Sequence, residues 1–195
     1  MKHISKIIAV ASFAVATMFA SNVKAQSTTP PNAWRFGIGI EGGVPTGNAH
    51  DISNAMLGGT ARLQYGVANN VALTLTSGYY NMFGKDAVKL PGDNNDYKFK
   101  SLGMVPLKAG IKAYAGGGFY FSAEVGAGFE TSGFGDVKND PIPEEAYKKN
   151  TKLILAPGLG YSWSNVDLGV RYENFSGQSN NYGMVAARLA YGFKL

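Results

Sequence analysis

The clearest feature of the chain is a regular alternation of apolar and polar residues, as in the stretch "NVDLGVRYENF" at residues 165–175. Val166 and Leu168 share one parity, whereas Asp167 and Arg171 share the other. A period of two residues predicts a β-strand with one apolar and one polar face. The alternation alone does not decide which face points into the barrel, because a water-soluble barrel turns its charges outward and a lipid-embedded barrel turns them inward.

Eight segments of this kind follow one another, and each is long enough, at about ten residues, to cross a membrane as a tilted strand. They cover residues 34–44, 56–67, 71–80, 102–113, 118–130, 152–163, 166–175 and 182–193. Short links alternate with longer ones, the short ones being 68–70, 114–117 and 164–165. We therefore predict an all-β, eight-stranded, antiparallel up-and-down transmembrane β-barrel with short periplasmic turns and longer extracellular loops.

The two parities differ in chemistry. The apolar parity holds no charge in any segment and carries aromatic residues near the segment ends, as in membrane girdles: Trp34, Tyr65, Tyr79, Tyr161, Trp163, Tyr172 and Tyr191. The interior of an eight-stranded barrel is just wide enough for side chains, so small residues and a few long charged ones fit there better than large apolar rings. We predict a lumen charge network of Arg35, Glu41, Arg62, Lys108, Lys112, Glu124, Glu130, Lys152, Asp167, Arg171, Glu173 and Arg188.

The first residues predict export. Lys2 and Lys6 precede an uncharged run over residues 7–20, and small residues follow up to Ala25. We expect a secretory signal peptide at residues 1–25, a polar leader at 26–33 and the barrel domain at 34–195. The absence of cysteine excludes a lipoprotein and disulfide stapling.

Composition supports a membrane barrel and gives no reason to expect nucleic-acid binding. Removal of the signal peptide takes away three lysines and no acidic residue, which lowers the formal net charge from +5 to +2. The chain has 26 glycines and only 16% charged residues. A glycine-rich, aromatic, charge-poor composition is typical of outer-membrane strand proteins and less often of soluble sandwiches.

The end of the chain resembles the C-terminal assembly signal of outer-membrane barrels. Leu189, Tyr191, Phe193 and Leu195 continue the apolar parity to the last residue, which is leucine rather than the usual phenylalanine. We therefore expect the last strand to meet the barrel-assembly machinery.

Three stretches carry a family resemblance: "VPLKAGIKAYAGGGFYFSAEVGAGF", "APGLGYSWSNVDLGVRYENFSG" and "ARLAYGFKL". They resemble the small outer-membrane β-barrel proteins common in Bacteroidetes, often described as PorT-like. The resemblance covers residues 101–195 well and the earlier strands more loosely. It implies an eight-stranded barrel in the outer membrane and supplies no catalytic motif.

Candidate enzyme and cofactor motifs are weak. Gly37, Gly39 and Gly42 match G-x-G-x-x-G, but a dinucleotide site needs a helix after the glycines and another strand follows here. His50 beside Asp51, in the first long link, is the only pair that suggests a lipid-modifying enzyme at the outer rim, and ordinary loop composition explains it as well.

Metal binding is equally weakly supported. Asp93, Asn95 and Asp96 in "PGDNNDY" lack the further acids and the glycine of a calcium loop, so a turn is the better interpretation. We expect no metal and no cofactor.

The predicted lumen holds seven basic and five acidic side chains. Because buried charges persist only when paired or hydrated, this near-balance predicts a salt-bridged plug rather than a selective channel. We expect a non-enzymatic outer-membrane protein with a structural or adhesive role, whose partners are membrane lipid and a surface partner of the long loops. The alternatives are a narrow pore, a soluble lipocalin-like carrier with the faces inverted, and a lipid-modifying enzyme.

Overall fold

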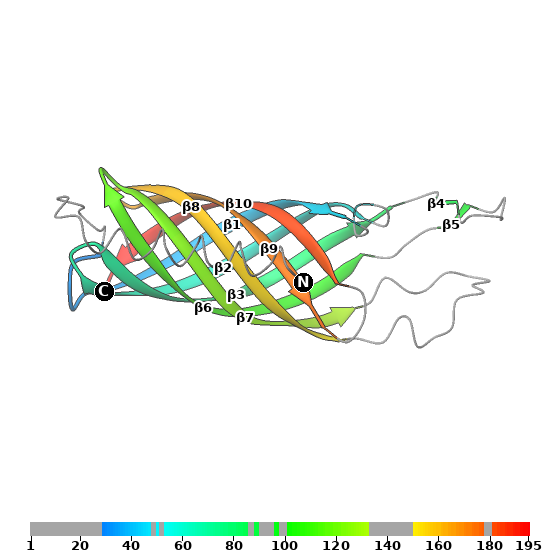
Figure 1. Cartoon of the computed structure of the whole chain (residues 1–195), viewed down its shortest axis with the longest axis horizontal. Helices are drawn as coiled ribbons and strands as arrows, with labels where there is room; N and C mark the ends of the chain where they lie inside the picture. Colours follow the sequence, from blue (N-terminus) through cyan, green and yellow to red (C-terminus); the bar gives the residue numbers. More distant parts are fainter. Residues whose placement is uncertain are drawn as a thin grey trace, which may run out of the picture.

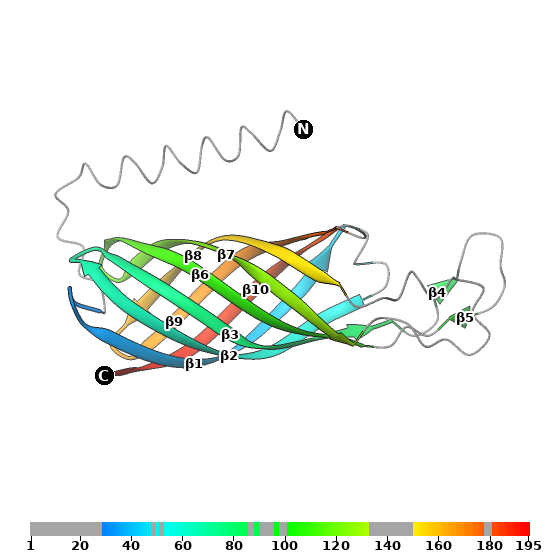
Figure 2. The same cartoon turned by 90° about the horizontal axis from the view of Figure 1, so that it is seen from below.

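Eight long strands close into one antiparallel barrel in the computed structural model (Figures 1 and 2). The structure describes residues 29–47, 50, 53–85, 88–89, 96–97, 101–132, 150–177 and 181–195. The barrel strands are β1 (Trp34–Thr46), β2 (Ser53–Ala68), β3 (Val71–Gly84), β6 (Leu102–Gly116), β7 (Phe119–Ser132), β8 (Thr151–Trp163), β9 (Val166–Ser176) and β10 (Tyr182–Lys194). The predicted eight-stranded antiparallel fold is confirmed.

The barrel closes by pairing of the first and last strands. The order around the barrel is β1-β10-β9-β8-β7-β6-β3-β2, and β1 pairs with both β10 and β2. Each strand therefore has two hydrogen-bonded neighbours, which leaves no free sheet edge and satisfies the backbone without water. No helix long and apolar enough to cross a membrane occurs among the residues that the structure describes.

The two ends of the barrel differ. Two-residue turns join β2 to β3, β6 to β7 and β8 to β9, all at the end that also holds the C-terminus (Figure 1). Two of these turns need a left-handed backbone, with φ of 57° at Gly117, 94° at Gly118 and 50° at Ser164. The remaining links are longer and leave the opposite end. We call the two ends the turn end and the loop end.

Several strands reach further toward the loop end than the sequence pattern predicts. β2 begins at Ser53 rather than at residue 56, and β3 ends at Gly84 rather than at residue 80. The second long link also contains a short hairpin, β4 (Val88–Lys89) paired with β5 (Asp96–Tyr97), which the pattern did not predict. The predicted signal peptide lies outside the described residues and stays a prediction.

Exposure settles which face points outward. Large apolar side chains of the apolar parity are exposed, for example Ile40 at 65%, Leu168 at 44% and Leu189 at 48%. Val71 is an exception: it is 5% exposed and lies where the β2–β3 register shifts between Gly66 and Ala68. A closed barrel with an apolar, uncharged outside and charged side chains inside is of the outer-membrane type. The inverted arrangement expected of a soluble lipocalin-like barrel is not observed.

Four aromatic pairs lie on the outer surface, all near the turn end. They are Trp34 with Tyr65, Phe119 with Phe121, Tyr161 with Trp163, and Tyr191 with Phe193, with ring centroids 4.7 to 5.8 Å apart. Amphipathic rings concentrate where lipid meets water, so this band fits one interface of a membrane.

Candidate functional site: the barrel lumen

The predicted lumen charges lie on inward positions of the strands. Ten of the twelve are buried: Arg35, Glu41, Arg62, Lys108, Lys112, Glu124, Lys152, Arg171, Glu173 and Arg188. The Asp167 side chain is 15% exposed. Glu130 is half-buried near the loop end, where its Oε2 accepts a hydrogen bond of 2.9 Å from the Asn150 amide.

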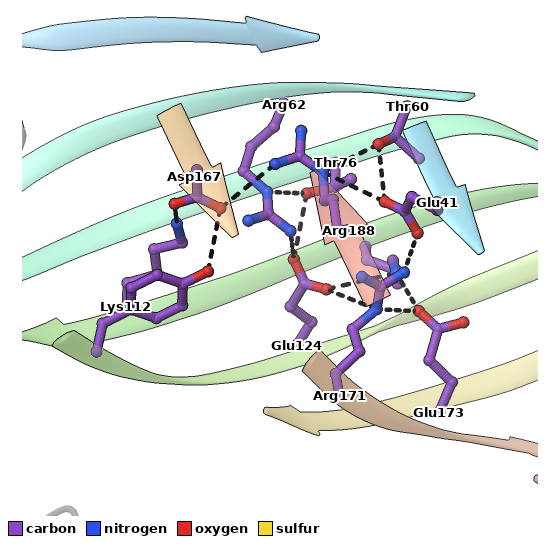
Figure 3. Close-up of polar contacts among 12 residues, drawn as sticks. Glu41, Thr60, Arg62, Thr76, Lys112, Glu124, Asp167, Arg171, Glu173 and Arg188 are labelled. Carbon is purple, nitrogen blue, oxygen red and sulfur yellow. Dashed lines mark hydrogen bonds and ion pairs between the residues drawn. The ribbon is translucent and has the colours of Figure 1, made fainter. Parts of the chain in front are cut away.

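The centre of the lumen is an ion-pair network around Arg171 of β9 (Figure 3). The Arg171 guanidinium pairs with Glu41 of β1, and its Nε lies 2.6 Å from Glu173 Oε1 and 4.0 Å from Glu124 Oε2. Lys108 pairs with Glu173, and its Nζ lies 3.4 Å from Glu124 Oε2. Each of these three carboxylates therefore lies near more than one cation or hydroxyl donor, which offsets part of the cost of burying it.

On the β2 and β3 side, Arg62 and Thr76 complete the environment of Glu124. Arg62 Nη2 lies 2.7 Å from Glu124 Oε1, and Arg62 Nε donates to Thr76 Oγ1 at 2.8 Å. The Thr76 hydroxyl in turn donates to Glu124 Oε1 at 3.2 Å. Arg62 and Thr76 are directly opposite each other in the β2–β3 register, so strand pairing itself holds this contact in place.

A second branch runs toward the turn end through Asp167. Arg188 bridges the two parts, with its Nε 3.3 Å from Glu41 Oε1 and its Nη1 3.6 Å from Asp167 Oδ1. Lys112 also pairs with Asp167 and lies 3.9 Å above the Tyr120 ring, a cation–π distance. The Tyr120 hydroxyl donates to Asp167 Oδ1 at 3.0 Å.

Tyr80 is a fully buried member of the network that the sequence analysis did not place inside. Its hydroxyl accepts hydrogen bonds from Lys108 (2.9 Å) and Arg171 (3.0 Å) and donates one to Glu41 (2.9 Å). Gly58, opposite Tyr80 in the β2–β3 register, makes room for the ring, because a Cβ there would lie 2.6 Å from Tyr80 Cδ1. Residue 80 has the parity of the lumen positions of its strand, so the alternation in the sequence could have placed Tyr80 inside the barrel.

An apolar cluster, which we call the mouth cluster, fills the lumen at the loop end. Every member is at most 3% exposed and lies in the part of its strand next to a longer link: Met56, Met82, Leu102, Met104, Ile154, Phe175 and Met184. Small residues and a few long charged ones were expected to fit the lumen better than large apolar rings, and the structure adds this apolar layer to them at the loop end. Methionine is flexible enough to fill the irregular space that remains between the strands.

The lumen is therefore closed in two layers, with the mouth cluster at the loop end and the ion-pair network beneath it. The network joins five basic residues (Arg62, Lys108, Lys112, Arg171 and Arg188) to four acidic ones (Glu41, Glu124, Asp167 and Glu173). Removal of one member of a buried pair costs about 3 to 5 kcal/mol, because the remaining charge is left buried and unpaired.

The other candidate sites gain little from the structure. His50 is exposed and Asp51 lies outside the described residues, while the nearby Ser53 hydroxyl is engaged with the Phe83 carbonyl oxygen at 2.8 Å. Gly37, Gly39 and Gly42 lie within β1 rather than before a helix. Asp93 and Asn95 lie outside the described residues, and within those described no group of three or more His, Cys, Asp or Glu side chains is placed to hold a metal ion.

Comparison with known proteins identifies the fold but no family. No family model and no curated protein sequence matches the chain. A crystal structure of Ail, the attachment invasion locus protein of Yersinia pestis, is similar with a TM-score of 0.58 and 14% identity, covering 84% of this chain and 99% of that one. The same protein in complex with the heparin analogue sucrose octasulfate gives a TM-score of 0.53 at 13% identity, covering 84% of this chain and 99% of that one.

A third similar structure is the backbone structure of the Yersinia pestis outer membrane protein Ail in a phospholipid bilayer nanodisc. It has a TM-score of 0.52 and 13% identity, covering 83% of this chain and 99% of that one. The likeness concerns the fold alone at these identities, and this chain has the fold of a small outer-membrane β-barrel.

Proposed function

We propose that the protein is an integral outer-membrane barrel that does not conduct, and that it acts through its loop end as a structural or adhesive surface protein. The observation that carries this proposal is the double closure of the lumen by the mouth cluster and the ion-pair network. The membrane location rests on the exposed apolar belt together with the fold shared with an outer-membrane protein.

The closed lumen favours a surface role over transport. The mouth cluster contains fully buried side chains such as Met104 and Phe175, and the network beneath it has Lys108 and Glu173 fully buried. An ion crossing the lumen would have to displace an apolar layer and then paired charges, both of which are costly. The loop end is then the part of the barrel left for contact with a partner. Ail, which shares the fold, is the attachment invasion locus protein of Yersinia pestis.

We also propose that the protein has no enzymatic activity and that its last strand, β10, is recognised by the barrel-assembly machinery. Membership of the PorT-like family remains part of this proposal. It is supported by the three stretches quoted above and by the eight-stranded fold.

Three measurements on the full-length protein test the proposal. Fractionation of cells should recover it with outer membranes, and unheated samples should migrate differently from boiled ones on a denaturing gel because a lipid barrel stays folded in detergent. Planar-bilayer recordings should show no stable single-channel steps. Large, stable steps would contradict the closed lumen, and recovery in the soluble periplasmic fraction would contradict the membrane location.

The adhesive role is tested separately by surface display. Cells displaying the protein should adhere to host-cell or matrix-coated surfaces more than cells displaying a variant with residues 133–149 replaced by a short turn. Equal adhesion by variants shortened in each of the longer links would leave the structural role as the only one supported.

A further inference from the structure

The segment before β1 folds back on itself at the turn end of the barrel (Figure 2). It has the sequence "TPPNA" at residues 29–33, which we call the strap. The Ala33 amide donates to the Pro30 carbonyl oxygen at 3.1 Å, and Asn32 has a φ of 60°. Proline at the second position and asparagine with positive φ at the third are typical of a type II turn. The turn reverses the chain, so that Thr29 lies on the barrel side of it.

Thr29 is buried in the turn end of the lumen. It is 1% exposed, and its Oγ1 accepts a hydrogen bond of 2.7 Å from Gln64 Nε2. The same Nε2 donates to the Tyr114 hydroxyl oxygen at 3.3 Å. Gln64 and Tyr114 are buried although they lie near the turn end of β2 and β6. The strap therefore covers side chains that the open end of a barrel would leave facing water.

Gly66 of β2 provides the space in which the strap docks. Its amide donates to the Ala33 carbonyl oxygen at 3.0 Å, and its carbonyl oxygen accepts from the Asn32 amide at 2.8 Å. A Cβ at Gly66 would lie 2.1 Å from the Pro30 carbonyl oxygen and 2.7 Å from that of Thr29. Since these are backbone atoms, only glycine allows the strap to approach β2 this closely.

The strap lies outside the strand pairing that closes the barrel. The β1–β2 ladder begins with Trp34 opposite Tyr65, and the strap precedes it. Release of the strap breaks its bonds to Gly66 and the hydrogen bond of 3.1 Å that the Tyr65 hydroxyl donates to Asn32 Oδ1, but no pairing between barrel strands. A segment of this kind opens at a much lower free energy than the whole fold.

We propose that the strap is a lid that closes the lumen at the turn end and opens while the barrel stays folded. The closed lid and the mouth cluster together enclose the ion-pair network from both ends. The open lid admits water and small solutes to Gln64 and the side chains beside it. The two prolines of the strap restrict its free conformations, which lowers the entropy lost when it docks again.

Thiol labelling tests the closed state directly. The natural chain contains no cysteine, so one introduced cysteine is the only thiol that can react. In the full-length protein refolded in detergent, Thr29→Cys should react with a charged maleimide much more slowly than Asn69→Cys, which is exposed in the β2–β3 turn. The two should react alike in unfolded protein. Equal rates in the folded protein would overturn the proposal.

Two substitutions at Asn32 test the turn without altering any strand. Valine strongly disfavours a positive φ, so Asn32→Val should speed the labelling of Thr29→Cys by about tenfold. Asn32→Gly is the matched control, because glycine adopts this conformation freely, and labelling should stay slow. Heat-modifiable migration on gels verifies that both proteins fold. The same labelling rate in the two variants would contradict a lid held by this turn.

A pair of substitutions in β2 tests where the lid docks. Gly66→Ala should release the strap and speed the labelling of Thr29→Cys, because the added Cβ occupies the place of the Pro30 carbonyl group. Gly59→Ala, on the exposed side of the same strand, is the matched control, since a Cβ there meets nothing within 4 Å. Unchanged labelling in folded Gly66→Ala would overturn docking at Gly66.

A last comparison separates opening of the lid from unfolding of the barrel. Glu41→Gln weakens the ion-pair network, far from the strap, and raises the unfolding constant of the whole barrel. Labelling of Thr29→Cys should not change in this variant if the lid opens alone. Labelling that speeds up in proportion to the unfolding constant would mean that Thr29 is exposed only by global unfolding and would refute an independent lid. None of these tests depends on the proposed surface role.

Discussion

Glu41→Gln is the sharpest test of the lumen network, because it removes one charge while keeping the shape of the side chain. Glu41 is 1% exposed and has partners on four other strands: it pairs with Arg171 and Arg188, and it accepts hydrogen bonds from Thr60 at 2.7 Å and Tyr80 at 2.9 Å. The substitution leaves two buried guanidinium groups without their shared carboxylate. The network would then hold five cations and three carboxylates.

The magnitude follows from the number of broken contacts. Breaking a buried pair by removing one partner costs about 3 to 5 kcal/mol. Arg171 keeps Glu173 and Glu124, and Arg188 keeps Asp167, which limits the loss. We therefore expect Glu41→Gln to lower the free energy of unfolding by about 3 kcal/mol, near the lower end of that range.

The assay is urea unfolding of the protein in lipid vesicles, followed by the fluorescence of Trp34 and Trp163, both of which are exposed on the outer surface. Glu130→Gln, at a half-buried position near the loop end, is the matched control and should change stability by less than about 0.5 kcal/mol. If Glu41→Gln stayed within that same margin, the lumen charges would be solvated rather than paired. The closed-lumen reasoning would then be refuted.

Three further substitutions test other parts of the barrel by the same unfolding assay. Leu168→Arg on the lipid face should cost about 2 to 4 kcal/mol, and an effect below about 0.5 kcal/mol, as at a water-facing position, would contradict the face assignment. Phe175→Ala in the mouth cluster should cost about 3 to 5 kcal/mol yet leave planar bilayers silent, because the network still closes the lumen; channel steps would show that the cluster alone is the seal. Gly58→Ala should cost about 1 to 3 kcal/mol by pressing on the Tyr80 ring, and a neutral result would mean that the strands separate easily there.

Parity in the sequence predicted the eight strands and their faces because a period of two links each residue to one side of a barrel wall. The same rule could not predict partners, which depend on strand register. Asp167, for example, pairs with Arg188 and Lys112 rather than with Arg171, although Arg171 lies on the same strand. Register places Glu41 directly opposite Arg188, and nothing in either segment alone indicates that.

The mouth cluster was missed for a different reason. Its members occupy lumen positions, but an interior expected to hold charges gave no reason to look for large apolar residues there. Met82 also lies beyond the predicted end of its segment, because β3 continues to Gly84. Closure at the loop end comes from seven side chains on six strands, which only the assembled barrel brings together.

The position of Glu41 also bears on the order of assembly. Its two cations, Arg171 and Arg188, lie 130 and 147 residues away along the chain, on the strands β9 and β10 that are made last. Until β1 meets β10, this carboxylate lacks both of these cations, and its stable place is in water rather than beside lipid. Before the barrel closes, β1 is therefore a free edge strand that carries the Glu41 carboxylate without these two cations. The carboxylate is neutralised only when β1 pairs with β10. The network therefore couples charge pairing to closure: a barrel with a missing or misregistered final strand would leave Glu41 without Arg188, which lies directly opposite it in the β1–β10 register.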